Sequence, residues 1–192
     1  MSSDARTAQT ASFQFRRAAF RASRESESRL LLLIDGFSRK ANGPRTLEGR
    51  VKLAKLDFLL RYPHHLATVL ESRGLREAER QMLDRQDSPL ESRMMRYRYG
   101  PWDPSYFAVL GSLVGRGLIE VVPAQGTNAL GYRTTESGAA LSDHLKDDGA
   151  FDEVVGRVTL LRRHLDLTGE SLKKLLYDLP EVADATWHEE LR

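Results

Sequence analysis

The segment of residues 99–135 constrains the fold of this chain more than any other. Pro101 and Pro104 remove two backbone donors and push the residue before each of them out of the helical region, which predicts a turn. Asp103 is expected to cap a helix with its carboxylate, and Pro104 suits the first helical position because an amide there would lack a partner anyway. The helix is predicted to end at Gly117. Its apolar residues recur at helical spacing on one face: Tyr106, Phe107, Leu110, Leu113 and Val114.

A β-hairpin and a further helix are predicted to follow. Residues 118–122 read as a short strand, 123–130 as a loop and 131–134 as the return strand. Thr135 can cap a helix over residues 136–145. A helix, a hairpin and a helix in this order are typical of the second half of a winged helix-turn-helix domain. The predicted fold class is therefore mainly α with a small β-hairpin wing, an α+β arrangement.

Two upstream helices are predicted to complete this core. Thr46 is expected to start a helix that Pro63 ends, with an apolar stripe wide enough for packing on two sides. A second helix is predicted to run from there to Gly74, a candidate C-cap. Residues 30–39 form a short apolar helix or buried segment before them. We expect the helices on either side of Pro63 to be the first pair of the winged-helix core.

The composition is that of an ordinary globular protein. Of 192 residues, 41% are hydrophobic and 29% are charged. The longest purely apolar run, residues 30–34, is far shorter than the ~20 residues of a transmembrane helix, so no membrane is expected. The absence of cysteine excludes disulfides and thiolate metal sites and is compatible with a cytoplasmic location. A net charge of +2, from 29 basic and 27 acidic residues, does not by itself favour nucleic acid.

Three parts of the chain differ in character. Residues 1–29 are rich in Ser, Ala and Arg and are interpreted as a disordered or partner-binding arm. Residues 30–146 form the predicted winged-helix core, which contains a charged insertion at 75–92. Residues 147–192 are predicted to be a helical hairpin and a tail. Three aromatic residues stand among the arginines of the arm: Phe13, Phe15 and Phe20.

The C-terminal hairpin is predicted from two apolar patterns. The first helix has a narrow seam at steps of four, three and four: Val154, Val158, Leu161 and Leu165. Thr168 can cap the second helix, which Pro180 ends. The hairpin either packs on the core or provides a surface for another chain.

A basic strand precedes the central turn. In MMRYRY, residues 94–99, arginine alternates with methionine and tyrosine, and the period of two predicts an extended strand with one basic face. Arg93, Arg96 and Arg98 are candidate nucleic-acid contacts, because charge interleaved with aromatic rings suits such binding. The alternative is structural: the strand pairs beside the wing while its arginines meet acidic groups of the insertion or of a partner subunit.

The sequence contains no recognisable catalytic, cofactor-binding or metal-binding motif. Gly111, Gly115 and Gly117 lack the spacing and the following Lys-Ser/Thr of a phosphate-binding loop. His64 and His65 are adjacent, so on a helix they point about 100° apart and are not expected to share a metal ion. With no cysteine and no G-x-S-x-G motif, no nucleophile is evident. We therefore expect a protein that is not an enzyme.

The face that a winged helix presents to DNA is poorly charged in this sequence. The exposed positions predicted for the helix are Ser105, Ala108, Gly111, Ser112 and Arg116. Only one of them is basic, and the loop 123–130 contains no Lys or Arg. Because phosphate neutralisation supplies most non-specific affinity for DNA, an adaptor between proteins fits this surface better.

Two blocks of the sequence resemble a known family. They are KLDFLLRYP at residues 55–63 and ESRMMRYRYGPWDPSYFAVLGSLVGRGLIE at residues 91–120. Both resemble the small middle component of the ABC-three-component systems, a family that includes the small subunit of Lamassu-type bacterial anti-phage defence. The likeness continues through residues 132–145 and covers about half of the chain. The turn GPWD at 100–103 is its most specific element.

The resemblance implies a non-catalytic accessory subunit of an SMC-type (structural maintenance of chromosomes) ATPase, whose third partner carries an effector, often a nuclease. DNA would be reached through the complex. Whether the motif residues contact a partner or lock the fold stays open at this point. The alternative is a dimeric winged-helix transcription regulator that uses the basic strand and the N-terminal arginines on DNA. The candidate partner-binding residues are Lys55, Asp57, Arg61, Tyr62, Gly100, Pro101, Trp102 and Asp103.

Overall fold

The structure, a computed structural model, describes residues 22–39, 45–84, 94–124 and 129–191. Predictions that fall on residues 1–21, 85–92 and 125–128 and on Arg93 lie outside these ranges. Within them the chain is mainly helical with a small antiparallel sheet, as the sequence predicted.

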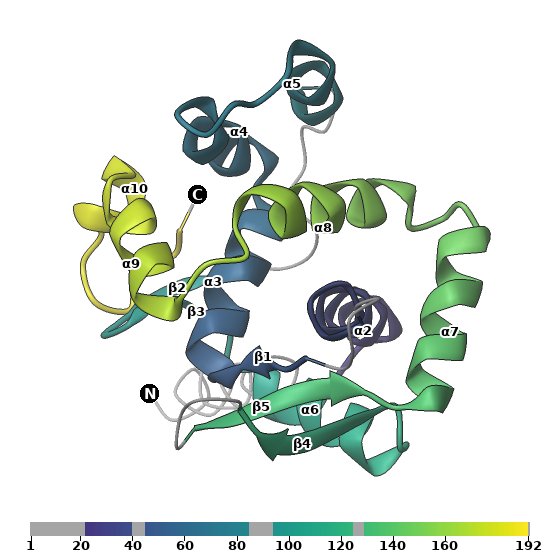
Figure 1. The fold of residues 1–192 in the computed structure, drawn as a ribbon. Helices are drawn as coiled ribbons and strands as arrows, with labels where there is room; N and C mark the ends of the chain where they lie inside the picture. The colour runs from purple at the N-terminus through teal and green to yellow at the C-terminus, as the bar shows by residue number, and fades with distance from the viewer. Residues whose placement is uncertain (1–21, 40–44, 85–93, 125–128, 192) are drawn as a thin grey trace, which may run out of the picture.

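The helix α2 (Arg24–Ser38) lies at the centre of the molecule. Its five consecutive apolar residues 30–34 are each at most 1% exposed. A helix that is apolar on every side must be covered on every side. Figure 1 shows α2 near the centre with helices around it and the sheet below it. The surrounding helices are α3 (Gly49–Arg61), α6 (Tyr106–Gly115), α7 (Glu136–Asp147) and α8 (Asp152–His164).

A three-stranded antiparallel sheet closes one side of α2. Its strand order is β1-β5-β4. β1 is Leu47–Glu48, β4 is Ile119–Pro123 and β5 is Leu130–Thr134. Tyr132 of β5 lies opposite Val121 of β4. The predicted hairpin is therefore confirmed in its described part, and it gains a third strand that the sequence did not predict.

A second antiparallel sheet joins β2 (Met95–Tyr97) to β3 (Gly100–Trp102). The C-terminal segment runs along the other edge of β2. The amide of His188 donates to the carbonyl of Arg96, and the amide of Leu191 donates to the carbonyl of Met94, at 2.8 Å in each case. The expected pairing of this basic strand beside the wing is therefore wrong, because both edges of β2 are occupied by other segments.

Two helices form a separate layer at the top of Figure 1. α4 (Pro63–Glu71) and α5 (Glu77–Asp84) pack on each other, and α4 also packs on α3. The prediction that the helices on both sides of Pro63 form the first pair of the core is wrong, since α2 takes the central position instead. Gly74 was predicted as the C-cap of this segment, but α4 ends at Glu71 with Ser72 as its C-cap, and Gly74 lies in the turn beyond it with a φ of 82°.

The C-terminal helices pack on the core, which decides between the two alternatives left open by the sequence. α8 lies against α2 and α3, and α9 (Gly169–Tyr177) lies against α3 and the short α10 (Pro180–Ala183). All four residues of the predicted seam on α8 are buried. Thr168 caps α9 by accepting a hydrogen bond from the amide of Ser171 at 3.2 Å. Residues 147–191 therefore share one hydrophobic core with α2 and α3.

The N-terminal boundary of the folded region was predicted too late. α2 begins at Arg24, whereas the arm was expected to reach residue 29. Ser23 and Ser26 cap the helix reciprocally: each hydroxyl accepts from the other residue's amide, at 3.0 and 2.9 Å. The first turn is polar, so the hydrophobic pattern did not indicate that the helix had already begun.

Thr46 does not start a helix. Leu47 and Glu48 form β1 opposite Tyr132 and Gly131 of β5, and α3 begins at the next residue. A strand of two residues has no periodicity of its own. Only its pairing with a segment far along the chain defines it.

Among the glycines in the described ranges, Gly138, in the first turn of α7, is the one where an added Cβ would make the closest contact. Thr135 caps this helix by accepting from the Gly138 amide at 3.0 Å, as predicted. A Cβ on Gly138 would lie 1.8 Å from the carbonyl oxygen of Leu118. We expect Gly138→Ala to lower the free energy of unfolding by about 1–3 kcal/mol, because the backbone must shift. Gly111→Ala on α6, where a Cβ meets nothing within 4 Å, should be neutral or stabilising by up to about 1 kcal/mol. Urea denaturation measures both, and equal effects would contradict the close approach.

Candidate functional site

A buried ion-pair network joins three helices at Asp57. Asp57 of α3 accepts from Arg29 Nε of α2 at 2.8 Å and from Arg61 Nε of its own helix at 3.0 Å. The hydroxyl of Tyr106 on α6 donates to the same carboxylate at 2.7 Å. None of these four side chains is more than 2% exposed. A buried charge persists only when it is paired and hydrogen-bonded, so these contacts fix α2, α3 and α6 against one another.

Asp103 extends this network to the turn before α6. Its Oδ2 accepts from Arg61 Nη2 at 2.6 Å, and its Oδ1 accepts from the amide of Ser105 at 2.8 Å. Two carboxylates thus balance two guanidinium groups. The prediction of Asp103 as the N-cap and Pro104 as the first helical residue is wrong, because α6 begins at Tyr106 and its N-cap is Ser105, which makes no side-chain capping bond. The Asp103 carboxylate instead holds the turn before the helix.

Burial and charge shift the pKa values within the network. Burial alone would raise the pKa of Asp57, but the guanidinium groups of Arg29 and Arg61 outweigh it and hold that pKa below its usual range. Burial and the charge of Asp57 raise the pKa of the Tyr106 hydroxyl. At neutral pH the carboxylate therefore stays ionised and accepts, while the phenol stays protonated and donates. The hydrogen bond between them, which joins α3 to α6, therefore persists at neutral pH.

Four of the candidate partner-binding residues belong to this buried region. Asp57, Arg61, Tyr62 and Asp103 are all buried. The Tyr62 hydroxyl donates to the carbonyl of Leu191 at 3.1 Å. Because these side chains are buried, the structure supports the interpretation that they stabilise the fold over the interpretation that they contact a partner directly.

Three further candidates, Lys55, Gly100 and Pro101, pack between α3, β3 and the start of α9. Lys55 Nζ donates to the carbonyl of Gly169 at 2.6 Å, and burial lowers the pKa of its ammonium group. Gly100 has a φ of 115°, which residues with a Cβ rarely adopt. Pro101 is buried in β3. These residues also serve the packing of the chain on itself.

Trp102 is the candidate that reaches toward the surface. It is half-buried and packs edge-on against Tyr106 and Phe107, with ring centroids 5.2 and 5.9 Å apart. Tyr106 is part of the buried network, whereas Phe107 is 59% exposed. Trp102 thus connects the network to the outer face of α6.

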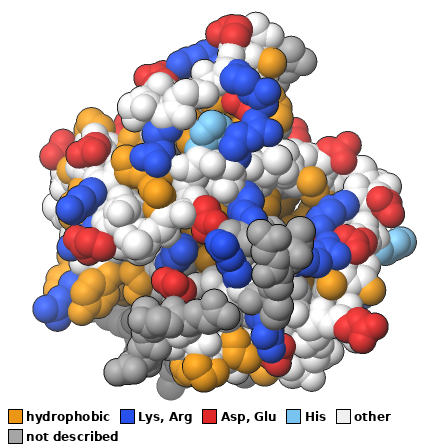
Figure 2. Space-filling model, viewed as in Figure 1, with side chains coloured by type: hydrophobic (Ala, Val, Ile, Leu, Met, Phe, Trp, Pro, Cys, Tyr) orange, Lys and Arg blue, Asp and Glu red, His pale blue; other side chains and the backbone are white. Residues whose placement is uncertain are grey.

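An apolar groove runs along this outer face, between α6, the strands β4 and β5, and the start of α3. We call it the α6 groove. Of the seven large hydrophobic side chains that are exposed in the described part of the chain, five line it. Figure 2 shows hydrophobic side chains at the lower edge of the molecule, over β4. The lining residues are Gly49, Arg50, Val51, Phe107, Leu110, Gly111, Val114, Val121, Ala129, Leu130 and Tyr132.

Sequence reasoning missed the groove because it assigned Phe107 and Val114 to the core. Both are exposed, at 59% and 42%. The buried residues of α6 are Tyr106, Val109, Leu110 and Leu113. Apolar residues cover more than half of this helix, so their periodicity could not decide which side faces inward. The spacing of Phe107, Gly111 and Val114 was the available signal for a second apolar stripe.

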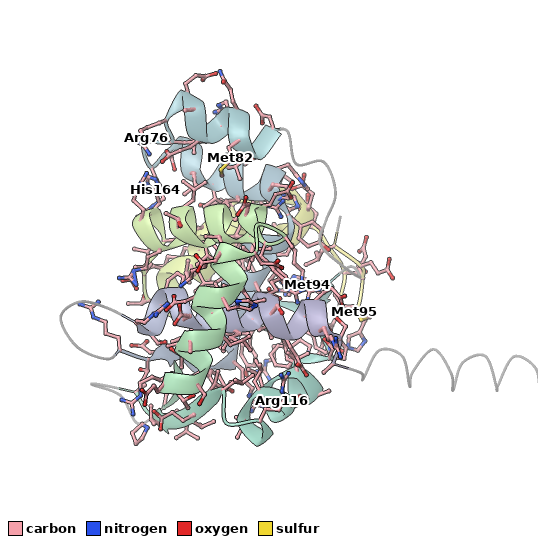
Figure 3. The ribbon with its side chains drawn as sticks, turned by 90° about the vertical axis from the view of Figure 1, so that its right-hand side faces the viewer. Arg76, Met82, Met94, Met95, Arg116 and His164 are labelled. Carbon is pink, nitrogen blue, oxygen red and sulfur yellow. The ribbon has the colours of Figure 1, made fainter. Side chains whose placement is uncertain are left out.

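Of the residues that line the groove, Arg50 is the basic one. The guanidinium of Arg50 lies over the ring of Phe107, 4.8 Å from its centroid. Arg133 pairs with Glu120 at 2.7 Å; both alternate with the groove-lining Tyr132 and Val121 and so lie on the other face of the hairpin. Arg116, the basic residue predicted to face DNA, pairs with Glu27 of α2 and lies below that helix in Figure 3. The groove therefore offers little positive charge to a phosphate backbone.

The three candidate nucleic-acid contacts, Arg93, Arg96 and Arg98, differ in their surroundings. Arg96 Nε donates to the carbonyl of Val182 at 3.0 Å, Arg96 Nη2 donates to the hydroxyl of Tyr177 at 2.8 Å, and its guanidinium stacks on that ring. Arg98 is exposed and lies over the ring of Tyr99. Arg93 lies outside the described residues. Among the described residues, Arg96 donates to the carbonyls of Val182 and Tyr97 and to the hydroxyl of Tyr177, while the acidic groups expected from the insertion lie partly outside the described ranges.

His64 and His65 approach each other more closely than adjacent positions on a helix predict, with 3.1 Å between their Nε2 atoms. The described residues contain no group of three or more His, Asp or Glu side chains placed to hold a metal ion. Among the helices that the structure describes, none combines the length and the apolar character needed to cross a membrane.

Comparisons of the chain with known protein families, with curated proteins and with solved structures found no match. The family resemblance therefore stays a prediction that the quoted sequence blocks carry.

Asp57→Asn tests the network, because it removes the charge that two buried guanidinium groups require. We expect the free energy of unfolding to fall by about 3–5 kcal/mol, since one side of a buried ion pair is left uncompensated. Tyr106→Phe removes one hydrogen bond from the same carboxylate and should cost only about 1–2 kcal/mol. Chemical denaturation at neutral pH measures both variants. A loss for Asp57→Asn no larger than that for Tyr106→Phe would contradict the role given to the charge.

Proposed function

We propose that this chain is a non-catalytic adaptor subunit that binds other proteins through the α6 groove. The observation that carries the proposal is the convergence of five exposed hydrophobic side chains on one groove, whose lining includes a single basic residue, Arg50, stacked on Phe107. Soluble monomers rarely leave a contiguous apolar patch open unless it binds something. Protein interfaces have such an apolar centre inside a more polar rim.

The chain order supports a winged helix-turn-helix core. Six elements of this core occur along the chain in the expected order: α2, β1, α3, α6, β4 and β5. In the proposed assignment the β4–β5 hairpin, which β1 extends to three strands, is the wing. The helices α4 and α5 and the β2–β3 hairpin are inserted between α3 and α6. In this assignment α6 is the third helix, which enters the major groove in DNA-binding proteins of the helix-turn-helix class.

The outer face of α6 suits a protein better than DNA. DNA-binding surfaces gain most of their affinity by neutralising phosphates with Lys and Arg. Here the corresponding face presents Phe107, Gly111 and Val114, while Arg116 is paired with α2. A partner with an apolar segment would bury these side chains and gain the free energy that their exposure now costs.

The partners implied by the resemblance are an SMC-type ATPase and an effector subunit, with a nuclease as the expected effector, in a cytoplasmic anti-phage complex. Trp102 lies in the GPWD turn that carries the resemblance, and its contact with Phe107 brings that turn to the edge of the groove. The proposed adaptor would present a groove whose shape depends on the Asp57 network behind it.

Copurification from the native operon tests this proposal. The tagged full-length protein, expressed with its neighbouring genes, should bring down a coiled-coil ATPase at fixed stoichiometry. Val114→Ser combined with Leu130→Ser should lower that recovery roughly tenfold or more, because it removes apolar anchors from the centre of the groove. Both side chains are exposed in the free chain, so its unfolding temperature should change little.

The matched control is Trp187→Ser, because Trp187 is 67% exposed but lies outside the groove. It should leave the recovery of the ATPase unchanged. Recovery without any ATPase, or equal recovery with the groove variant, would count against the adaptor. Recovery as a dimer that shifts operon DNA in a gel, with steep salt dependence, would favour the transcription regulator instead.

A further inference from the structure

A group of arginines surrounds the C-terminal end of α8, and we call this surface the α8 basic face. Within the described ranges, the carboxylates that pair with these arginines are Glu79 of α5 and Asp166, which follows α8. Figure 2 shows Lys and Arg side chains between the top of the view, where α5 lies, and its centre. The arginines of the face are Arg45, Arg73, Arg76, Arg162 and Arg163.

The first cluster on this face surrounds Glu79. Its carboxylate accepts hydrogen bonds from Arg76, just before α5, and from Arg163 of α8. The Glu79 side chain is 9% exposed, whereas those of Arg76 and Arg163 are 67% and 48% exposed. Figure 3 shows Arg76 and His164 at the same edge of the molecule. The carboxylate therefore lies beneath the two guanidinium groups, which present their positive charge to solvent.

The second cluster surrounds Asp166. Arg45, which precedes β1, and Arg162 of α8 approach its Oδ2 atom to 3.7 and 4.0 Å. Arg73 lies between the two clusters, where its Nε donates to the carbonyl of His164 at 3.1 Å. Because a carbonyl is neutral, this contact cancels none of the charge of Arg73.

The two clusters form one surface, because Arg162 and Arg163 are adjacent in α8. Five guanidinium groups against the two paired carboxylates leave an excess of three positive charges. The whole chain has a net charge of only +2. Positive charge is therefore concentrated on this face and is balanced by acidic residues elsewhere.

This distribution of charge suits the backbone of a nucleic acid. Guanidinium groups form paired hydrogen bonds with phosphates, and neutralising phosphates supplies most of the affinity of proteins for DNA. Single strands also need aromatic rings on which unpaired bases stack. The large aromatic side chains that are exposed in the described part of the chain are Tyr99, Phe107 and Trp187, on the β2–β3 turn, on α6 and in the C-terminal segment. The face therefore favours a duplex over a single strand.

We propose that the α8 basic face binds the phosphate backbone of double-stranded DNA without reading its sequence. The face is formed by α8, the segment around the start of α5 and the residue before β1, whereas the α6 groove is formed by α6, β4, β5 and the start of α3. The two surfaces use different residues. The inference goes beyond the proposed function and holds whether or not the groove binds a partner.

Fluorescence anisotropy of the purified full chain with a short labelled duplex tests this inference. Arg45→Gln combined with Arg76→Gln should weaken binding roughly tenfold at low salt and should lower the slope of log affinity against log salt by about two, because two phosphate contacts are lost. Each carboxylate keeps its other arginine in this variant, so the unfolding temperature should change little.

The matched control is Arg98→Gln combined with Lys174→Gln, which removes two exposed positive charges outside the face. It should keep the salt slope of the wild type. Absence of duplex binding by the wild type at low salt, or an equal loss in the control, would overturn the proposal. Tighter binding of the corresponding single strand, or of operon DNA over a scrambled duplex, would contradict the backbone of a duplex as the ligand.

The groove variant, Val114→Ser combined with Leu130→Ser, keeps this inference apart from the proposed function. It should bind the duplex as the wild type does, because it leaves the α8 basic face unchanged. Loss of ATPase recovery with unchanged duplex binding would count against the adaptor alone. Loss of duplex binding in the groove variant would count against the α8 basic face.

Discussion

The burial of Asp57 is the constraint on which the rest of the structure depends. An ionised carboxylate with no exposed surface needs charged and hydrogen-bonding partners, and it finds them in Arg29, Arg61 and Tyr106 on the three helices α2, α3 and α6. Because each contact is directional, the three helices meet in one arrangement. Asp103 joins the same network through Arg61 and thereby positions the turn that leads into α6. The orientation of α6, and with it the position of the groove, follows from this buried charge.

The same network contains residues of the sequence motif that resembles the middle components of ABC-three-component systems, and it gives them a structural role. Arg61 and Asp103 come from the two separate blocks of the resemblance, and the structure brings them into contact inside the molecule. Their side chains are enclosed, so they act on a partner only through the shape that they impose. Trp102 forms the link from this interior to Phe107 at the edge of the groove.

The helix α6 carries two apolar stripes with different roles. One stripe, which includes Val109 and Leu113, is buried in the core. The other, which includes Phe107 and Val114, lines the groove. A helix that is apolar on more than half of its surface is stable only if both sides are covered, and the folded core covers one of them. This imbalance is the physical basis for proposing a docking surface.

Local physical chemistry determined a large part of the fold from the sequence alone. The caps at Thr135 and Thr168 and the spacing of the apolar seam of α8 each depend on residues within a few turns, and the structure confirms them. Tertiary contacts decided the rest. The strand β1 exists because β5 lies beside it, and the partners of Asp57 include residues 28 and 49 positions away. The sequence did not predict the groove for the same reason. Hydrophobic periodicity predicts that a helix has an apolar stripe but not whether another part of the chain covers that stripe. Only the packing of α6 against α2 and α3 assigned Tyr106 to the interior and its neighbour Phe107 to the surface.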